Sequence, residues 1–190
     1  MRTSLAIEIN ITNFKKATFM VTKISMNAPL TQNVKKDDVE RVKSAYEKLK
    51  MAVVVASLLT LRFYNTRNGV RMAIVRSYIP NTRSFREFKL PLNQELFDAL
   101  ISIWFGQEPK EITSFDIAGW EAETEENLSF EVFKLLNEAG VRMIAEEDKV
   151  KEGEVVGVPF KVKNGGKFVI DLYLPLNEEV ENYLKANNLR

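Results

Sequence analysis

The sequence predicts an α+β fold in which antiparallel β-meanders are each followed by a helix and the whole unit is duplicated within the chain. Three observations support this prediction: short runs that alternate apolar and polar residues, turn signals between such runs, and two nearly matching strand-to-helix stretches. The turn signals are Asn68-Gly69 and Asn164-Gly165-Gly166, since asparagine and glycine tolerate the positive φ of a tight hairpin. A chain of 190 residues is long enough to bury a sizeable core.

Alternation with a period of two residues predicts strands, and an apolar stripe that begins behind a capping residue predicts helices. Asn93 and Asn177 are the expected N-caps of two helices, because their side chains can accept a hydrogen bond from the first helical turn. The strands expected in this way lie at 4–12, 17–26, 51–64, 70–79, 84–92, 111–118, 141–147, 155–162 and 167–174. The expected helices lie at 37–50, 94–104, 130–139 and 178–186.

An internal repeat is indicated by two stretches 84 positions apart. Residues 88–100 read FKLPLNQELFDAL and residues 172–184 read LYLPLNEEVENYL, and six of these thirteen positions are identical. A strand that passes through proline to an asparagine cap is favourable local chemistry in any protein, but the shared apolar positions and the Asn-Gly turns upstream favour duplication. We therefore expect meander–helix units at 51–105 and 141–187, with a looser third copy at 4–50.

Charge divides the chain into two halves. Residues 1–107 hold seventeen Lys and Arg against eight Asp and Glu, a balance of +9, whereas residues 108–190 hold ten against eighteen, a balance of −8. The two balances sum to the net charge of +1. We expect a basic N-terminal half and an acidic C-terminal half within one pseudo-symmetric body, with the basic face binding an acidic ligand and the acidic face repelling it or docking a basic protein. Accidental segregation of charge is the alternative.

The residue types that are missing restrict the chemistry. The chain has no cysteine and no histidine, which excludes disulfides, thiolate nucleophiles, Cys/His zinc sites and histidine acid–base catalysis. No phosphate-binding glycine motif and no apolar run of membrane-spanning length occur in the sequence. We expect an intracellular, cytoplasmic protein that is not an enzyme and needs no cofactor or metal.

The stretch from Arg62 to Lys89 carries the candidate binding site. It has seven basic residues against one acid, with five aromatic residues among them. Such a β-surface can attract phosphates and stack unpaired bases, although a solvated hairpin with half its rings in the core would read similarly. The candidate nucleic-acid-binding residues are Arg62, Tyr64, Arg67, Arg71, Arg76, Tyr78, Arg83, Phe85, Arg86 and Lys89.

The stretch from Leu58 to Trp104 also resembles a known group of folds. A basic meander that ends near LPLN and leads into a helix beginning Asn-x-Glu is similar to the β-β-β-β-α unit of the Whirly, Pur and positive transcriptional coactivator group. The resemblance covers about a quarter of the chain, and residues 141–187 are similar in outline. It implies binding of single-stranded DNA or RNA over the sheet by dimers or tandem units, so a homodimer is one expected arrangement. Helices at 37–50 and 128–139, and a second copy whose sheet cations are only Lys161, Lys163 and Lys167, depart from the pattern.

Two other functions are compatible with the sequence. A protein-interaction module, such as an inhibitor or assembly subunit, could dock a basic partner through the acidic half. A carboxylate-dependent nuclease would need spaced carboxylates with a lysine across a hairpin, which Asp171 with Lys161 or Lys163 could supply. The spacing of these residues is generic, so binding of single-stranded nucleic acid with little sequence preference is the leading hypothesis.

Overall fold

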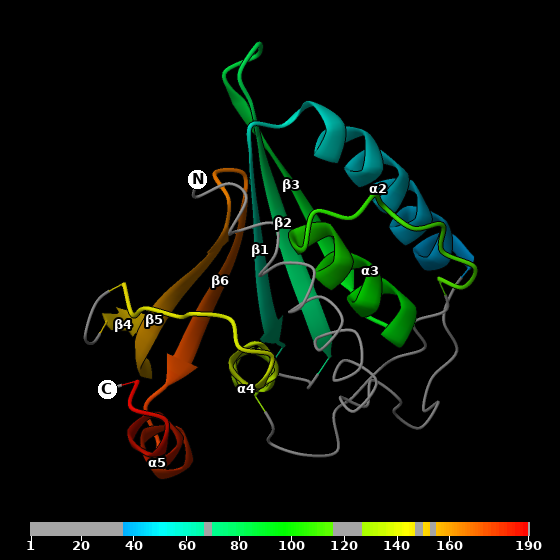
Figure 1. The fold of residues 1–190 in the computed structure, drawn as a ribbon. Helices are drawn as coiled ribbons and strands as arrows, with labels where there is room; N and C mark the ends of the chain where they lie inside the picture. The colour runs from blue at the N-terminus through cyan, green and yellow to red at the C-terminus, as the bar shows by residue number, and fades with distance from the viewer. Residues whose placement is uncertain (1–35, 67–69, 116–126, 147–149, 153–154, 190) are drawn as a thin grey trace.

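The fold is α+β, with helices packed on a mixed six-stranded sheet (Figure 1). The structure, a computed structural model, describes residues 36–66, 70–115, 127–146, 150–152 and 155–189. The strands are β1 (Leu58–Asn65), β2 (Arg71–Ile79), β3 (Ser84–Pro91), β4 (Val150–Glu152), β5 (Val155–Asn164) and β6 (Phe168–Pro175). The helices are α2 (Lys36–Val55), α3 (Gln94–Trp104), α4 (Leu128–Glu138) and α5 (Glu178–Ala186).

The sheet consists of two antiparallel meanders joined edge to edge. Its strand order is β3-β2-β1-β6-β5-β4, so the first meander (β1 to β3) and the second meander (β4 to β6) meet where β1 pairs with β6. That pair is parallel, and its register sets Leu59 opposite Phe168 and Arg62 opposite Asp171. Each neighbouring pair within a meander is antiparallel.

Helices α2, α3 and α4 lie on one face of the sheet, which we call the helix face (Figure 1). Leu59, Leu61 and Phe63 of β1 are buried on this face, as the two-residue period of a strand requires. Helix α4 packs against both β1 and β6, directly over the junction of the two meanders. Its Phe133 ring lies 4.6 Å from the Phe160 ring of β5.

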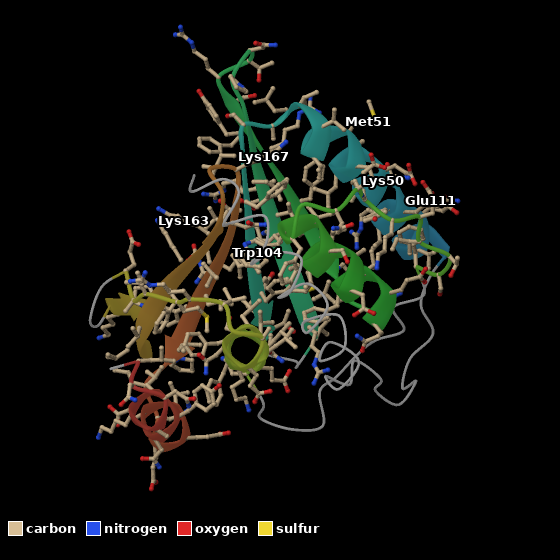
Figure 2. The ribbon with its side chains drawn as sticks, viewed as in Figure 1. Lys50, Met51, Trp104, Glu111, Lys163 and Lys167 are labelled. Atoms are coloured by element: carbon tan, nitrogen blue, oxygen red, sulfur yellow. The ribbon has the colours of Figure 1, made fainter. Side chains whose placement is uncertain are left out.

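One continuous core includes residues of both meanders. Helix α3 follows the first meander in the chain, but its last residue contacts the second. The indole Nε1 of Trp104 donates a hydrogen bond to the Val162 carbonyl of β5 at 3.0 Å. The Asn164 side chain donates in return to the Trp104 carbonyl at 2.7 Å. Figure 2 marks Trp104 at the centre of the molecule and Lys167 near the end of α2, where its Nζ donates to the Val53 carbonyl at 2.6 Å. The two meanders are therefore tied together through both the sheet and the helices.

The structure confirms several expected elements and corrects others. Asn93 caps α3 and Asn177 caps α5, and β2, β3, β5 and β6 lie where alternation placed them. The expected strand at 51–64 is wrong in its first part, because residues 51–55 continue α2. Ala52 and Val53 fall on the buried stripe of that helix with Leu49, so the valine-rich run reflects a helix end and not a strand.

Two further strand predictions are also corrected. Residues 111–115 form no strand; their Thr113 and Ser114 instead donate backbone hydrogen bonds to the Glu95 carboxylate at the start of α3. In the segment predicted as a strand at 141–147, the described residues 141–146 make a single antiparallel bridge, Ala145 with Phe160. Four parts of the prediction lie outside the described residues: the expected strands before residue 36, the looser copy at 4–50 in its strand part, the Asn68-Gly69 turn, and residues 116–118 of the expected strand at 111–118.

Both halves place the same kinds of element in the same order: helix, meander, helix. Strands β3 and β6 begin at Ser84 and Phe168, and the caps Asn93 and Asn177 follow, each pair 84 positions apart. Helices α2 and α4 end at Val55 and Glu138, before the first strand segment of each meander. The offset of 84 positions also relates two residue pairs, to within one position: Leu61 with Val75 in the first meander and Ala145 with Phe160 in the second.

Candidate nucleic-acid interface

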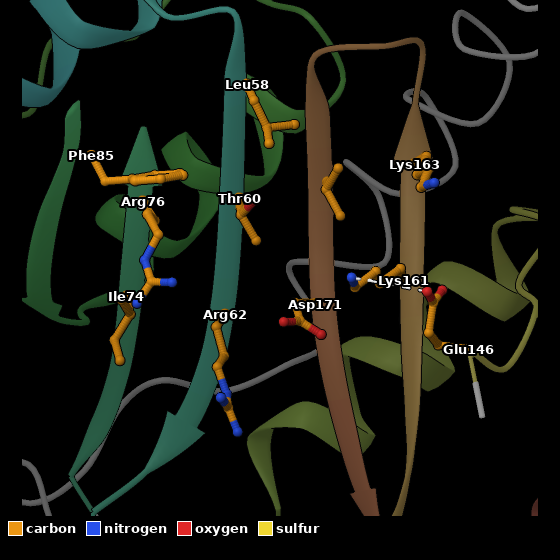
Figure 3. Close-up of a pocket in the computed structure, with 11 residues that line it drawn as sticks. Leu58, Thr60, Arg62, Ile74, Arg76, Phe85, Glu146, Lys161, Lys163 and Asp171 are labelled. Atoms are coloured by element: carbon orange, nitrogen blue, oxygen red, sulfur yellow. Dashed lines mark ion pairs between the residues drawn. The ribbon is translucent and has the colours of Figure 1, made fainter. Parts of the chain in front are cut away.

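The face of the sheet opposite the helix face, which we call the open face, carries no described helix. Alternation decides which side chains reach it: because Leu59, Leu61 and Phe63 are buried on the helix face, their neighbours Thr60 and Arg62 point the other way (Figure 3). The same alternation in the other long strands brings polar and charged residues to the open face.

One row of the open face runs across five strands. The pairing places Glu87 of β3 beside Arg76 of β2, Arg76 beside Thr60 of β1, Thr60 beside Val169 of β6, and Val169 beside Lys163 of β5. Neighbouring strands are about 4.8 Å apart, so cations from the two meanders stand within one ligand's reach.

The next row has a second set of charges. Lys89 of β3 is opposite Ile74 of β2, Ile74 is opposite Arg62 of β1, Arg62 is opposite Asp171 of β6, and Asp171 is opposite Lys161 of β5. Each row thus has basic residues from both meanders, with the parallel β1–β6 pair between them.

These rows surround a hollow of about 450 Å³, centred on the junction of the meanders (Figure 3). Four cations and two carboxylates line it, which leaves an excess of positive charge. The residues lining the hollow are Leu58, Thr60, Arg62, Ile74, Arg76, Phe85, Glu146, Lys161, Lys163, Val169 and Asp171.

An aromatic pair borders the hollow at its β2–β3 side. The Tyr78 and Phe85 rings are tilted at 48° with their centroids 5.1 Å apart, and Tyr78 is also opposite Leu58 of β1. Phe85 is exposed and leans inward above Arg76 (Figure 3). An exposed ring beside a guanidinium group can stack a planar base while the cation holds its phosphate.

Two ion pairs partly neutralise the cations of the open face. Arg76 contacts Glu87 at 2.9 Å, and Lys161 contacts Glu146 at 4.0 Å. All four side chains are exposed, and exposed ion pairs contribute little because water and salt screen them. A polyanion could therefore compete with Glu87 and Glu146 at low energetic cost.

The structure places six of the ten candidate binding residues on the open face: Arg62, Tyr64, Arg76, Tyr78, Phe85 and Lys89. Arg71 is instead on the helix face, where its guanidinium group contacts Glu131 of α4 at 3.9 Å. Arg86 is exposed on that same face, opposite buried Ser77. Arg83 lies in the β2–β3 turn with φ of 50°, and Arg67 falls outside the described residues.

Lys161 and Lys163 line the hollow but are not among the candidate residues that the sequence predicts. The alternation of buried Val158, Phe160 and Val162 was sufficient to place both lysines on the opposite face of β5. No local sequence pattern predicts that β5 lies two strands from β1 in the sheet. This position depends on the pairing of β1 with β6, which are far apart in the chain.

Comparison with models of protein families, with characterised proteins and with solved structures finds no match to this chain. None of the helices described here is both long and apolar enough to cross a membrane. Within the described ranges, no group of three or more Asp and Glu side chains is positioned to hold a metal ion. Function must therefore be inferred from the chemistry of the open face.

Proposed function

We propose that this protein binds single-stranded DNA or RNA across the open face of its sheet, without catalysing a reaction. The observation that carries the proposal is the convergence of Arg62, Arg76, Lys161 and Lys163 on one hollow beside the exposed Phe85 ring. The cations hold phosphates and the ring stacks a base.

A single strand suits this surface better than a duplex. In a duplex the base faces are covered by their neighbours, whereas an unpaired base offers its face to a side chain such as Phe85. The contacts available at the hollow are charge and stacking, neither of which distinguishes one base sequence from another. We therefore propose low sequence specificity.

We also propose that the chain arose by internal duplication, which would explain why two similar meanders form one surface. The common order of elements, the spacing of 84 positions and the identical Pro-Leu-Asn stretches support it. The resemblance to the Whirly, Pur and positive transcriptional coactivator group is part of this proposal. The second meander contributes Lys161 and Lys163 to the same surface, which favours one composite site over two separate ones.

The proposal is tested by fluorescence anisotropy of a labelled single strand of about thirty nucleotides, compared with duplex, over a series of salt concentrations. We expect preferential binding of the single strand that weakens steeply with salt. Each phosphate contact contributes about 0.7 to the slope of log affinity against log salt, so Arg76→Ala and Lys163→Ala should each reduce the slope by about that amount.

Arg86→Ala is the matched control, because it removes the same type of side chain from the same hairpin but from the helix face. It should leave affinity and slope nearly unchanged, since a distant positive charge contributes little through salt solution. Equal losses for Arg76→Ala and Arg86→Ala would show that binding depends on overall charge and not on the open face. Absence of binding at low salt would refute the proposal.

A further inference from the structure

Strand β3 forms one edge of the described sheet, and apolar side chains are exposed near it. Ser84, Phe85, Arg86 and Glu87 are four consecutive exposed residues of this strand. Helix α2 packs on β2 and β3, and Met51 in its last turns points away from the body (Figure 2).

The equivalent positions of the second half are buried. Met51 and Val55 are 69% and 55% exposed, whereas the residues 84 positions later, Leu135 and Ala139, are 3% and 0% exposed. The difference has a clear cause, because β6 is covered along its edge by β1 whereas β3 has no described neighbour beyond it. The apolar residues near the β3 edge therefore resemble those near β6, but β3 lacks a described neighbouring strand like the one that β1 provides to β6.

We propose that a second copy of this chain completes that junction, with β3 pairing antiparallel to β3 of the partner and the two α2 helices side by side. A two-fold arrangement brings the apolar ends of both α2 helices together. A head-to-tail arrangement would instead use the outer edge of the second meander, where α5 has Glu181 and Lys185 at the positions of buried Phe97 and Ile101 in α3. That polar surface fits the exposed Met51 and Val55 poorly.

Charge selects the register of the proposed strand pair. The end of α2 is level with Phe85, because the Ser57 amide bonds to the Tyr78 carbonyl and Tyr78 is opposite Phe85. A two-fold axis at Phe85 brings Glu87 of each copy to Arg83 in the turn just before the other copy's β3, whereas an axis at Arg86 or Glu87 would oppose like charges. The ladder that results joins Ser84–Arg86 of the two copies, which is one residue pair shorter than the β1–β6 pair of Leu59–Arg62 with Phe168–Asp171.

The helix layer fits the same arrangement. Because α2 lies over both β2 and β3, continuing the sheet across the edge separates the two α2 axes by two strand spacings, about 10 Å. Packed helices are separated by about 8–10 Å, so side chains at Met51 and Val55 can interdigitate with those of the partner. The open faces of both copies then lie on the same side of one longer sheet.

The oligomeric state of the full chain, measured by sedimentation equilibrium, tests this inference. We expect a dimer for the unmodified protein and a monomer for Met51→Lys combined with Val55→Lys, with circular dichroism confirming that the variant is folded. The control Val156→Lys charges a half-exposed apolar residue of β5, away from β3, and should remain dimeric. Since the helix variant leaves the open face intact, its affinity for a single strand at the hollow separates failure of this inference from failure of the proposed function.

Cysteine cross-linking tests the register, because the chain has no native cysteine. Phe85→Cys should form an intermolecular disulfide on mild oxidation, since directly opposed strand residues lie within disulfide reach. Lys89→Cys, on the same face of the same strand but away from the axis, should not. A monomeric native chain, a charged variant that stays dimeric, or equal cross-linking of both cysteine variants would each overturn the inference. The inference would also be overturned if the chain dimerised only after removal of residues 1–35, because that result would indicate that this segment covers the β3 edge.

Discussion

At Gly157 of β5 the absence of a side chain leaves room for the aromatic ring of Tyr173. A Cβ atom added there would lie 2.5 Å from Cζ of the Tyr173 ring and 2.6 Å from the Leu174 carbonyl oxygen. The ring could turn aside, but the carbonyl belongs to the β6 backbone and could move only with the strand. Gly157 therefore permits the close approach of β5 and β6 where it pairs with Pro175.

Gly157→Ala should lower the free energy of unfolding by about 1–3 kcal/mol, the usual cost of overpacking. Urea denaturation followed by circular dichroism would measure it. Gly166→Ala is the matched control, because a Cβ atom added there would meet nothing within 4 Å and its φ is not in the positive range. That change should be neutral or stabilising by up to about 1 kcal/mol, since alanine restricts the unfolded chain. Equal destabilisation by both changes would contradict the packing argument.

The face of the sheet on which a residue lies could be predicted from the sequence for some residues and not for others. Alternation placed Arg62, Phe85 and Lys89 on one face because each stands in a strand whose apolar residues are unambiguous. It could not place Arg71, since β2 has Met72 and Ile74 on one face and Ala73 and Val75 on the other. The largely buried ion pair with Glu131 is a tertiary contact between β2 and helix α4, which no local pattern encodes.

At the scale of elements, α3 and α5 begin with the same cap in different surroundings. The Asn93 side-chain oxygen accepts from the Leu96 amide at 2.8 Å, and its amide group also donates to the Ser114 carbonyl at 2.8 Å. The Asn177 oxygen accepts from the Val180 amide at 2.9 Å, and its side chain is exposed. Asn93 thus both caps a core helix and fixes the segment that follows it.

Asn177→Ala should cost about 1 kcal/mol of stability, the typical value for an N-cap, and Asn93→Ala should cost more. The additional loss at Asn93 is that of the hydrogen bond to Ser114, about 0.5–1.5 kcal/mol. Aspartate separates the two contributions, because it keeps the capping oxygen and removes the donor. Thermal unfolding should therefore show a loss for Asn93→Asp and almost none for Asn177→Asp; the reverse order would be inconsistent with this assignment.

Elements with strong local signals were predictable, whereas segments with weak or conflicting signals were not. Both caps, and the strands that lead to them, follow from short stretches of sequence in which each residue favours the same structure. The run from Met51 to Val55 favours a strand by composition and a helix by its position on the stripe of Tyr46 and Leu49. Tertiary burial of Ala52 and Val53 decided the outcome, as it commonly does when propensities conflict.

For the whole molecule, the shared core predicts that the two meanders cannot unfold separately. Trp104 of α3 is buried and bonded to β5, and α4 covers the strands of both meanders. Chain order alone suggested two similar units but not their parallel contact, because β1 and β6 are brought together across most of the chain. The hollow lined by both meanders could not be predicted from the sequence, because it exists only where β1 pairs with β6.

Urea unfolding should therefore show one cooperative transition, with Trp104 fluorescence, in a Trp120→Phe background, coinciding with far-ultraviolet circular dichroism. Leu59→Ala in the first meander and Leu136→Ala in α4 should each shift both signals together, with a loss of about 2–5 kcal/mol. Two separate transitions, or a Leu136 variant that leaves the Trp104 signal unchanged, would indicate independent halves.

The junction at β1 and β6 has a further consequence for how the chain reaches its native state. The contact between Lys167 and the Val53 carbonyl spans 114 positions, so its loop-closure entropy must be overcome before it stabilises anything. Such non-local contacts slow folding, whereas the hairpins of each meander are local and can form early. During synthesis the first meander is complete before β6 leaves the ribosome, so the cationic hollow is among the last features of the molecule to be assembled.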